Sequence, residues 1–209
     1  MYIEQEDILN HISAKPFHII SEAADELGVE AYVIGGYVRD IFLYRPSKDI
    51  DVVAVGSGIE LAKVVAGKLG KKTHLSVFKN FGTAQVKSGD LEIEFVGARK
   101  ESYNRDSRKP IVEDGTLEDD QNRRDFTINA MAYNESQGLV DIYGGLADIK
   151  AGVIRCVGDA KERFTEDALR MMRAVRFSAQ LGYRIDEDTR TAMTELAPNL
   201  QKISAERIQ

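Results

Sequence analysis

The chain has 209 residues, of which 43% are hydrophobic and 30% are charged, and its formal net charge is −6. This composition is typical of a folded protein of one or two domains, and the acidic balance argues against a uniformly basic nucleic-acid surface. No apolar run approaches the roughly 20 residues that span a bilayer, and the N-terminus lacks a signal-peptide core. The cytoplasm is therefore the expected compartment. A single cysteine, Cys156, excludes an internal disulfide, and three scattered histidines argue against zinc.

The first predicted elements are helices over residues 5–13 and 16–28, with Ser13 as a cap of the second. An apolar strand end at residues 32–34 then meets the paired glycines Gly35 and Gly36, which allow a sharp turn. A short helix over residues 37–43 follows. A strand, a glycine turn and a helix N-terminus together favour an anion site, and Arg39 can add a guanidinium for a phosphate.

The next strand starts with two carboxylates, Asp49 and Asp51. Residues i and i+2 of a strand share a face, so both side chains point the same way. Like charges held together favour a cation between them, and Mg²⁺ typically takes one or two carboxylates plus water and phosphate oxygens. A glycine turn that is followed by this carboxylate pair therefore indicates a binding site for a nucleoside triphosphate with Mg²⁺. The structural alternative is an ordinary strand with a solvated acidic face.

GGYVRD, followed by DID nine residues later, resembles the first signature of the tRNA nucleotidyltransferase and bacterial poly(A) polymerase family. This family is the class II branch of the polymerase β-like nucleotidyltransferases. The resemblance implies an α+β fold, with a head of a small mixed sheet and flanking helices over residues 1–150 and a helical neck from 151 to 209. It also implies that Asp49 and Asp51 bind Mg²⁺ and that Gly35, Gly36 and Arg39 hold the triphosphate.

A helix over residues 59–69 and three strands, around 74–77, 82–87 and 91–96, complete the predicted sheet, with a hairpin turn at residues 88–90. Glu92 and Glu94 share a face of the last strand. Polymerase β-like sites often have a third acidic residue, so Glu94 is a catalytic candidate. The alternative is a solvated hairpin face.

Residues 99–122 are polar and charged with little periodicity, which predicts a long loop that is functional or mobile. The following sequence, RRDFTINAMAY, resembles the second family motif. By that resemblance Arg124 contacts the nucleotide phosphates, and Asp125 lies near the sugar or shapes the pocket. The alternative is a helix with a solvated charged end. Residues 141–149 resemble the third motif, which predicts a tight turn and a hinge. A short strand at residues 154–157 follows, with Cys156 as core filler.

Residues 165–180 are predicted to form one helix, with Thr165 as its N-cap and an acidic first turn. The packing residues expected on it are Leu169, Met172, Val175, Phe177 and Ala179. The polar side chains expected to line one stripe are Asp167, Arg170, Arg173 and Arg176. Spacing alone favours an exposed, salt-bridged face.

The same segment, EDALRMMRAVRF, also resembles the nucleotide-selecting motif of the family. The resemblance implies that Asp167 and Arg170 read the base edge, while Arg173 and Arg176 contact the nucleotide or nearby phosphates. Adenine and cytosine both present an amino donor beside a ring-nitrogen acceptor, which suits one carboxylate and one guanidinium. The implied partners are ATP and CTP.

A helix over residues 187–196 follows, and residues 203–208 resemble the start of a further motif. We therefore expect a head and part of a neck from a longer protein whose later helices bind tRNA. The resemblance implies addition of CMP and AMP to the tRNA 3′ end with release of pyrophosphate. The alternatives are a poly(A) polymerase that uses ATP alone and a binding module without catalysis. A small-molecule nucleotidyltransferase would lack RRDFTINAMAY and the EDALR helix.

Overall fold

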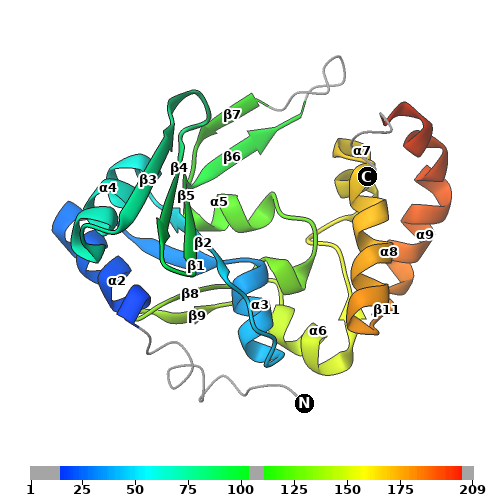
Figure 1. Ribbon diagram of the computed structural model, residues 1–209. Helices are drawn as coiled ribbons and strands as arrows, with labels where there is room; N and C mark the ends of the chain where they lie inside the picture. Colours follow the sequence, from blue (N-terminus) through cyan, green and yellow to red (C-terminus); the bar gives the residue numbers. More distant parts are fainter. Residues whose placement is uncertain (1–14, 104–110, 204–209) are drawn as a thin grey trace.

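The computed structural model describes residues 15–103 and 111–203, and Figure 1 shows a sheet at the centre with α8 and α9 to one side. The first half consists of α2 (Lys15–Leu27), β1 (Ala31–Ile34), α3 (Gly36–Phe42), β2 (Asp49–Ala54), α4 (Gly58–Leu69), β3 (Thr73–Phe78), η2 (Lys79–Phe81), β4 (Thr83–Ser88) and β5 (Leu91–Gly97). These elements confirm the predicted order over this half. The helix expected over residues 5–13 and its neighbour Ser13 lie outside the described residues.

The second half begins with a β-ribbon and ends in helices. Its elements are β6 (Arg99–Ser102), β7 (Ile111–Asp114), α5 (Leu117–Asn122), η3 (Thr127–Asn129), β8 (Ala132–Asn134), β9 (Gly138–Val140), α6 (Gly145–Ala151), β10 (Val153–Ile154), α7 (Ala160–Glu166), α8 (Leu169–Leu181), β11 (Arg184–Ile185), α9 (Glu187–Leu196) and η4 (Ala197–Lys202). Within the part of the chain described here, no helix is long and apolar enough to cross a bilayer.

The seven-stranded sheet has the order β3-β4-β5-β2-β1-β8-β9. Strands β2 and β5 are parallel, and the other neighbouring pairs are antiparallel. This arrangement confirms the mixed α+β sheet. Because β2 is central, the two aspartates that start it lie inside the sheet rather than at an edge.

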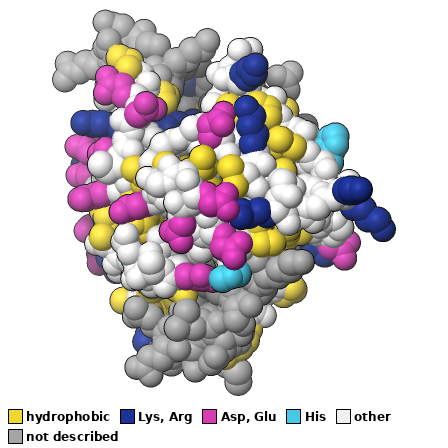
Figure 2. Space-filling view, turned by 90° about the vertical axis from the view of Figure 1, so that its left-hand side faces the viewer, with side chains coloured by type: hydrophobic (Ala, Val, Ile, Leu, Met, Phe, Trp, Pro, Cys, Tyr) yellow, Lys and Arg dark blue, Asp and Glu magenta, His cyan; other side chains and the backbone are white. Residues whose placement is uncertain are grey.

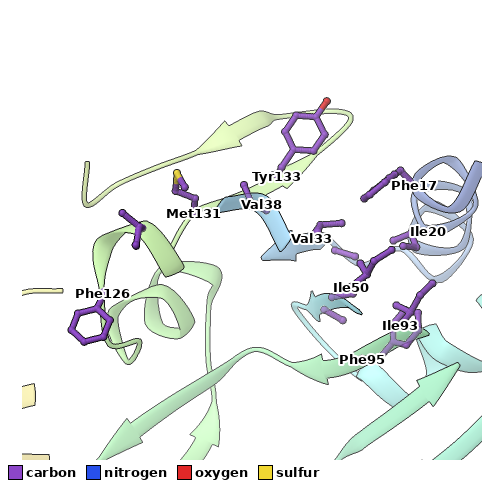
Figure 3. Packing of buried hydrophobic residues seen from close by; sticks show 14 of the residues in the cluster. Phe17, Ile20, Val33, Val38, Ile50, Ile93, Phe95, Phe126, Met131 and Tyr133 are labelled. Carbon is purple, nitrogen blue, oxygen red and sulfur yellow. The ribbon is translucent and has the colours of Figure 1, made fainter. Parts of the chain in front are cut away.

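One face of this sheet packs on helices α2 and α4. Ile50, Ile93 and Phe95 point to that face and are at most 2% exposed, and Phe17 and Ile20 of α2 belong to the same cluster. Figure 3 shows these side chains together below α2. Strand residues alternate between the two faces, so burial of Ile50 directs its neighbours Asp49 and Asp51 to the other face.

The prediction of a loop over residues 99–122 is wrong where this segment forms two strands and a helix. Strands β6 and β7 pair as an antiparallel ribbon, and α5 follows. The ribbon gives no periodic signal because all four residues of β7 are exposed. Helix α5 begins with a capping box between Thr116 and Asp119, a signal that the sequence does contain.

The prediction of a single helix over residues 165–180 is also wrong. Asp167 is extended, with φ −148° and ψ 104°, and separates α7 from α8. Thr165 is not an N-cap, because it lies in the last turn of α7 and its hydroxyl donates to the Lys161 carbonyl. The expected packing is wrong at Met172 and Val175, which are 37% and 55% exposed. The buried side chains of α8 are Arg170, Met171, Ala174 and Phe177.

Candidate active site

Carboxylates gather on the open face of strands β2 and β5. The parallel register sets Asp51 beside Glu94 and Asp49 beside Glu92. Asp49, Asp51 and Glu94 are exposed, whereas Ile50 between the aspartates is buried. Asp51 is exposed as a whole residue, but the surrounding protein still reduces the hydration of its carboxyl group. This desolvation, followed by repulsion from Glu94 and Asp49, raises the pKa of Asp51 above the usual aspartate range, although Arg124 opposes the shift. The sheet therefore concentrates negative charge at Asp51.

This charge fits a hard divalent cation that the protein holds by few ligands. Among the residues described, no group of three or more histidine, cysteine or acidic side chains could hold a metal ion by itself. Mg²⁺ does not require such a group, because it keeps several waters and is commonly bound by one or two carboxylates plus substrate phosphates. Asp49 and Asp51 supply that donor set, and Glu94 lies beside Asp51 on the neighbouring strand.

The glycine turn brings the backbone close to two guanidinium groups. Gly35 has φ 82°, and a Cβ atom there would lie 3.2 Å from Nη1 of Arg124. A Cβ atom on Gly36 would lie 3.3 Å from Nη2 of Arg39. Only glycine adopts this φ without strain, so the turn keeps space open beside both arginines.

A buried carboxylate, Asp120, holds Arg124 in place. Asp120 has no exposed surface, and its Oδ1 accepts from Nη2 of Arg124 at 3.0 Å. Its other contacts are with the Arg123 guanidinium, at 3.3 Å, and the Arg99 backbone N–H, at 3.0 Å. Asp120 thus joins α5, β6 and the RRD segment. Asp120 was not predicted as a site residue, because residues 99–122 were expected to form a loop.

A chain of polar contacts links the glycine turn to α8. Nη1 of Arg39 donates to Oδ1 of Asn129 at 2.5 Å, and Nδ2 of Asn129 donates to Asp125 at 3.3 Å. Asp125 in turn lies 2.7 Å from Nη2 of Arg173. Asp125 and Arg173, which were each predicted as site residues, are therefore in contact with one another, whereas Asn129 was not predicted.

Three guanidinium groups surround the ring of Phe177. Arg39, Arg173 and Arg176 lie 5.1, 5.5 and 5.2 Å from the ring centroid. Cation–π attraction lets one aromatic ring support several cations that would otherwise repel one another. The result is a concentration of positive charge that suits a triphosphate.

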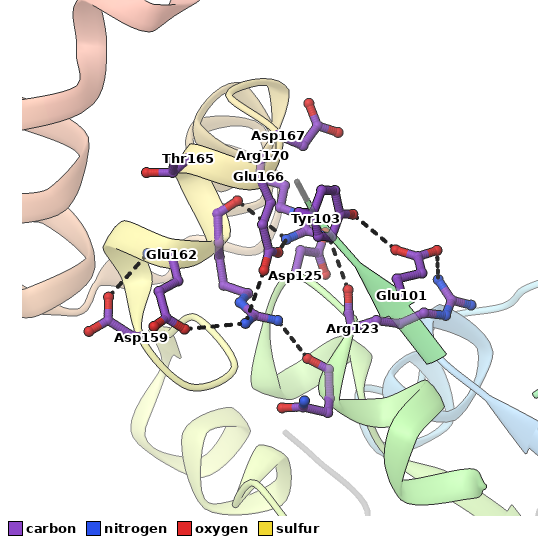
Figure 4. Close-up of polar contacts among 12 residues, drawn as sticks. Glu101, Tyr103, Arg123, Asp125, Asp159, Glu162, Thr165, Glu166, Asp167 and Arg170 are labelled. Carbon is purple, nitrogen blue, oxygen red and sulfur yellow. Dashed lines mark hydrogen bonds and ion pairs between the residues drawn. The ribbon is translucent and has the colours of Figure 1, made fainter. Parts of the chain in front are cut away.

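The Arg170 guanidinium contacts the ends of α7 and α5 rather than the Asp167 carboxylate, as Figure 4 shows. Its Nη1 donates to Glu166 at 2.8 Å, and its Nη2 donates to the Arg123 carbonyl at 2.9 Å. Its side chain is 11% exposed. The Asp167 carboxylate instead accepts from the Leu169 N–H, at 3.1 Å, in the turn between α7 and α8. The expected single stripe from Asp167 to Arg176 is therefore wrong.

Strand β6 and the residue after it contribute a further set of contacts with Arg123. Tyr103 donates its hydroxyl hydrogen to Glu101 at 2.9 Å, and Glu101 lies 3.7 Å from Arg123. Burial of the hydroxyl and the adjacent Glu101 charge raise the pKa of Tyr103 to about 12, so its hydroxyl stays protonated at neutral pH. This link was not predicted.

These groups line one cleft of about 1410 Å³ between the sheet, α5 and α8. The predicted site residues that line it are Gly35, Gly36, Arg39, Asp51, Arg124, Asp125, Asp167, Arg170, Arg173 and Arg176. Within the described part of the chain, Asp49 and Glu94 are not among the lining residues, so Asp51 marks the end of the cleft.

The sequence matches two known families. Residues 31–155 match the poly A polymerase head domain, and residues 182–209 match a probable RNA and SrmB-binding site of polymerase A. The chain is 43% identical to a CCA-adding enzyme of Leuconostoc mesenteroides over 202 residues, which is 95% of this chain and 48% of that protein. A CCA-adding enzyme of Streptococcus pneumoniae is 42% identical over 90% of this chain and 46% of its own length.

Solved structures agree with these matches. The CCA-adding enzyme of Bacillus stearothermophilus in complex with CTP superposes with a TM-score of 0.76 and 36% identity, over 93% of this chain and 47% of that chain. An apo CCA-adding enzyme gives a TM-score of 0.87 and 31% identity, over 100% of this chain and 51% of that chain. The chain thus spans about half the length of the relatives it matches. It belongs to the poly A polymerase head-domain family.

Proposed function

We propose that this chain carries out the nucleotidyl transfer of a template-independent RNA nucleotidyltransferase, which adds CMP and AMP from CTP and ATP to the 3′ end of tRNA. The observation that carries the proposal is that Asp51 lines the same cleft as Arg39, Arg124 and Arg173. Curated relatives at 43% and 42% identity are CCA-adding enzymes, which supports this activity over a poly(A) polymerase or a binding module.

In the proposed reaction, the RNA 3′-hydroxyl oxygen bonds to the α-phosphorus while the bond to the bridging oxygen breaks. Pyrophosphate leaves with that electron pair, and the hydroxyl proton passes to solvent. Asp49 and Asp51 would hold Mg²⁺, which lowers the pKa of the hydroxyl and offsets charge on the phosphate oxygens. Gly35 and Gly36 allow the triphosphate to approach the backbone. Arg39 and Arg124 hold it in line, and Glu94 is the third carboxylate.

Base selection in this proposal uses Asp167 and Arg170. The Asp167 carboxylate accepts from the amino group of adenine or cytosine, and Arg170 donates to the ring nitrogen. Glu166 and the Arg123 carbonyl orient the Arg170 guanidinium through the hydrogen bonds described above. Guanine and uracil present a carbonyl oxygen and an N–H at these positions. The carbonyl oxygen would face the Asp167 carboxylate, and the N–H would face the donors of Arg170. Asp125, Arg173 and Arg176 contact the sugar and phosphates.

The test is incubation of the full-length gene product with Mg²⁺, a tRNA lacking its 3′-terminal CCA, and each nucleotide separately. We expect CMP to be added first and AMP to be added to a tRNA that ends in CC. Repeated addition of AMP alone would favour the poly(A) polymerase. Nucleotide binding without transfer would favour the binding module. Asp49→Asn and Asp51→Asn should each abolish transfer without loss of helical circular dichroism.

We also propose that residues 1–150 form the catalytic head and residues 151–209 begin the neck. The last strand of the seven-stranded sheet ends at Val140, and α7, α8 and α9 follow. Hydrogen exchange in denaturant tests this division. The sheet and the three helices should open at different denaturant concentrations, whereas a single common transition would contradict two units.

A further inference from the structure

Strands β3, β4 and β5 have one covered face and one open face. The side chains that point toward α4 are buried, and they include Ala84, Val86, Ile93 and Phe95. The alternate side chains include His74, Phe78, Lys87 and Glu94, all of which are exposed. Because alternate residues of a strand share a face, these four lie on the same side of the sheet as Asp49 and Asp51.

The strand pairing aligns this open face with the catalytic carboxylates. One row across the strands is Asp49, Glu92, Lys87 and His74, and the next is Asp51, Glu94, Gln85 and Ser76. Strand β3 is the edge of the seven-stranded sheet. Three strand spacings separate β2 from β3, about 14 Å in total. That length accommodates at most about four nucleotides of an RNA strand, since its phosphates are at least about 3.4 Å apart, and two or three when the strand is more extended.

The open face lies on the side of β2 opposite the nucleotide cleft. Gly35 and Gly36, which line the cleft, follow β1, whereas β5 lies on the other side of β2. In phosphoryl transfer the attacking and leaving oxygens are roughly in line. If the triphosphate extends into the cleft from Asp51, the hydroxyl must therefore arrive from the side of β5.

The side chains of this face suit a single RNA strand. Lys87 is 55% exposed and lies 3.6 Å from Glu92, which also accepts from Gln85. At the end of β3, Phe78 is 46% exposed and Phe81 of η2 is 76% exposed. Aromatic rings stack on bases and lysines pair with phosphates in single-strand binding proteins. Figure 2, which views the molecule from the side of α2 and α4, shows acidic side chains along the left and centre and basic ones scattered from the upper left to the right edge.

We propose that the open face of β3, β4 and β5, with the η2 turn, binds the last two or three nucleotides of the RNA strand whose 3′-hydroxyl attacks. Lys87 contacts a phosphate, and Phe81 stacks on a base. The inference rests on the proposed function and adds the path of the RNA strand. Because Asp49, Asp51, Glu92 and Glu94 would repel the RNA backbone, its 3′ end binds here after a divalent cation has offset their charge.

The first test is steady-state transfer by the full-length gene product with Lys87→Ala or Phe81→Ala. Phe81→Ala should raise KM for the RNA about 5- to 150-fold, the range of one lost stacking contact, while KM for CTP is unchanged. Phe81→Trp, which keeps an aromatic ring at this position, should leave KM for the RNA close to that of the wild type. Lys87→Ala should make the decrease of log apparent RNA affinity with log salt less steep by about 0.7, the value for one phosphate of a single strand. Lys63→Ala is the matched control, since Lys63 is 50% exposed and lies 3.2 Å from Glu60.

The second test is crosslinking of an RNA with 4-thiouridine next to its 3′-terminal nucleotide, with and without Mg²⁺. The crosslink should map to residues 73–88 and should require Mg²⁺. The inference would be overturned if the wild type were active and the Phe81→Ala and Lys87→Ala variants had the same KM for RNA and the same salt dependence as Lys63→Ala. A crosslink to α8 or α9 would also overturn it. If the wild type were a dimer in solution and Phe81→Ala a monomer, the inference would be overturned in favour of a contact between copies. Absence of any transfer by the wild type would refute the proposed function instead.

Discussion

Asp120 offers a direct test of how the chain holds the Arg124 guanidinium near Asp51. Its carboxylate has no exposed surface and contacts Arg124, Arg123 and the Arg99 N–H. The Asp120→Asn variant keeps the shape of the side chain but removes the counter-charge that Arg124 contacts and leaves Arg123 with Glu101 alone. The side chains of Arg123 and Arg124 are 17% and 18% exposed, so solvent compensates little.

Loss of one partner from a buried ion pair costs about 3–5 kcal/mol. The asparagine oxygen still accepts a hydrogen bond, so we expect Asp120→Asn to lower the free energy of unfolding by about 3 kcal/mol. For a protein of this size that corresponds to a decrease in Tm of about 6–12 °C. Affinity for CTP should fall as well, because Arg124 loses the contact that orients it.

The assay is urea unfolding followed by circular dichroism, together with CTP titration. Glu118→Gln is the matched control, because Glu118 is an exposed residue of the same helix and the substitution removes the same charge. An exposed change of this kind usually alters stability by less than about 0.5 kcal/mol. If Asp120→Asn and Glu118→Gln gave the same urea midpoint and CTP affinity, the role assigned to Asp120 would be refuted.

Three further predictions concern single side chains. Because burial and then Glu94 raise the pKa of Asp51, its ionised form disfavours folding above that pKa. Asp51→Asn should therefore raise Tm at pH 7 without divalent cations, and the gain should vanish below about pH 3.9; a lower Tm would contradict the charge argument. Burial raises the pKa of the Cys156 thiol to about 12, so a thiol reagent at pH 8 should label the unfolded chain and spare the native one. Asp167→Asn keeps an acceptor for the Leu169 N–H but removes the charge, and discrimination against UTP and GTP should fall by ~1.5–3 kcal/mol. Unchanged selectivity in competitive incorporation would limit Asp167 to this local hydrogen bond.

The elements that the sequence predicted correctly are those with a strong local signal. Alternating burial in β2 follows from DIDVVA, and the turn before α3 follows from the paired glycines Gly35 and Gly36. These features led directly to the carboxylates and to one wall of the cleft. The motif RRDFTINAMAY likewise led to Arg124 and Asp125, both of which line the cleft.

The missed features depend on contacts between distant residues or on one dihedral angle. Arg39 and Asn129 are 90 positions apart, and no periodic pattern connects them. The break at Asp167 interrupts an otherwise helical sequence, and a side-chain hydrogen bond to the Leu169 N–H favours it. With that break, Arg170 pairs with Glu166 across i, i+4. The sequence contains both the i, i+4 pair of Glu166 with Arg170 and the i, i+3 pair of Asp167 with Arg170, and spacing alone does not choose between them.

We propose that one nucleotide site extends from Asp51 to the start of α8. A crystal structure of the protein with Mg²⁺ and a CTP analogue that cannot be cleaved would test this proposal. We expect the α-phosphate beside Asp49 and Asp51, the triphosphate along Arg39 and Arg124, and the cytosine edge at Asp167 and Arg170. A triphosphate bound on the open face of β3, β4 and β5, or a base that contacts neither Asp167 nor Arg170, would contradict it.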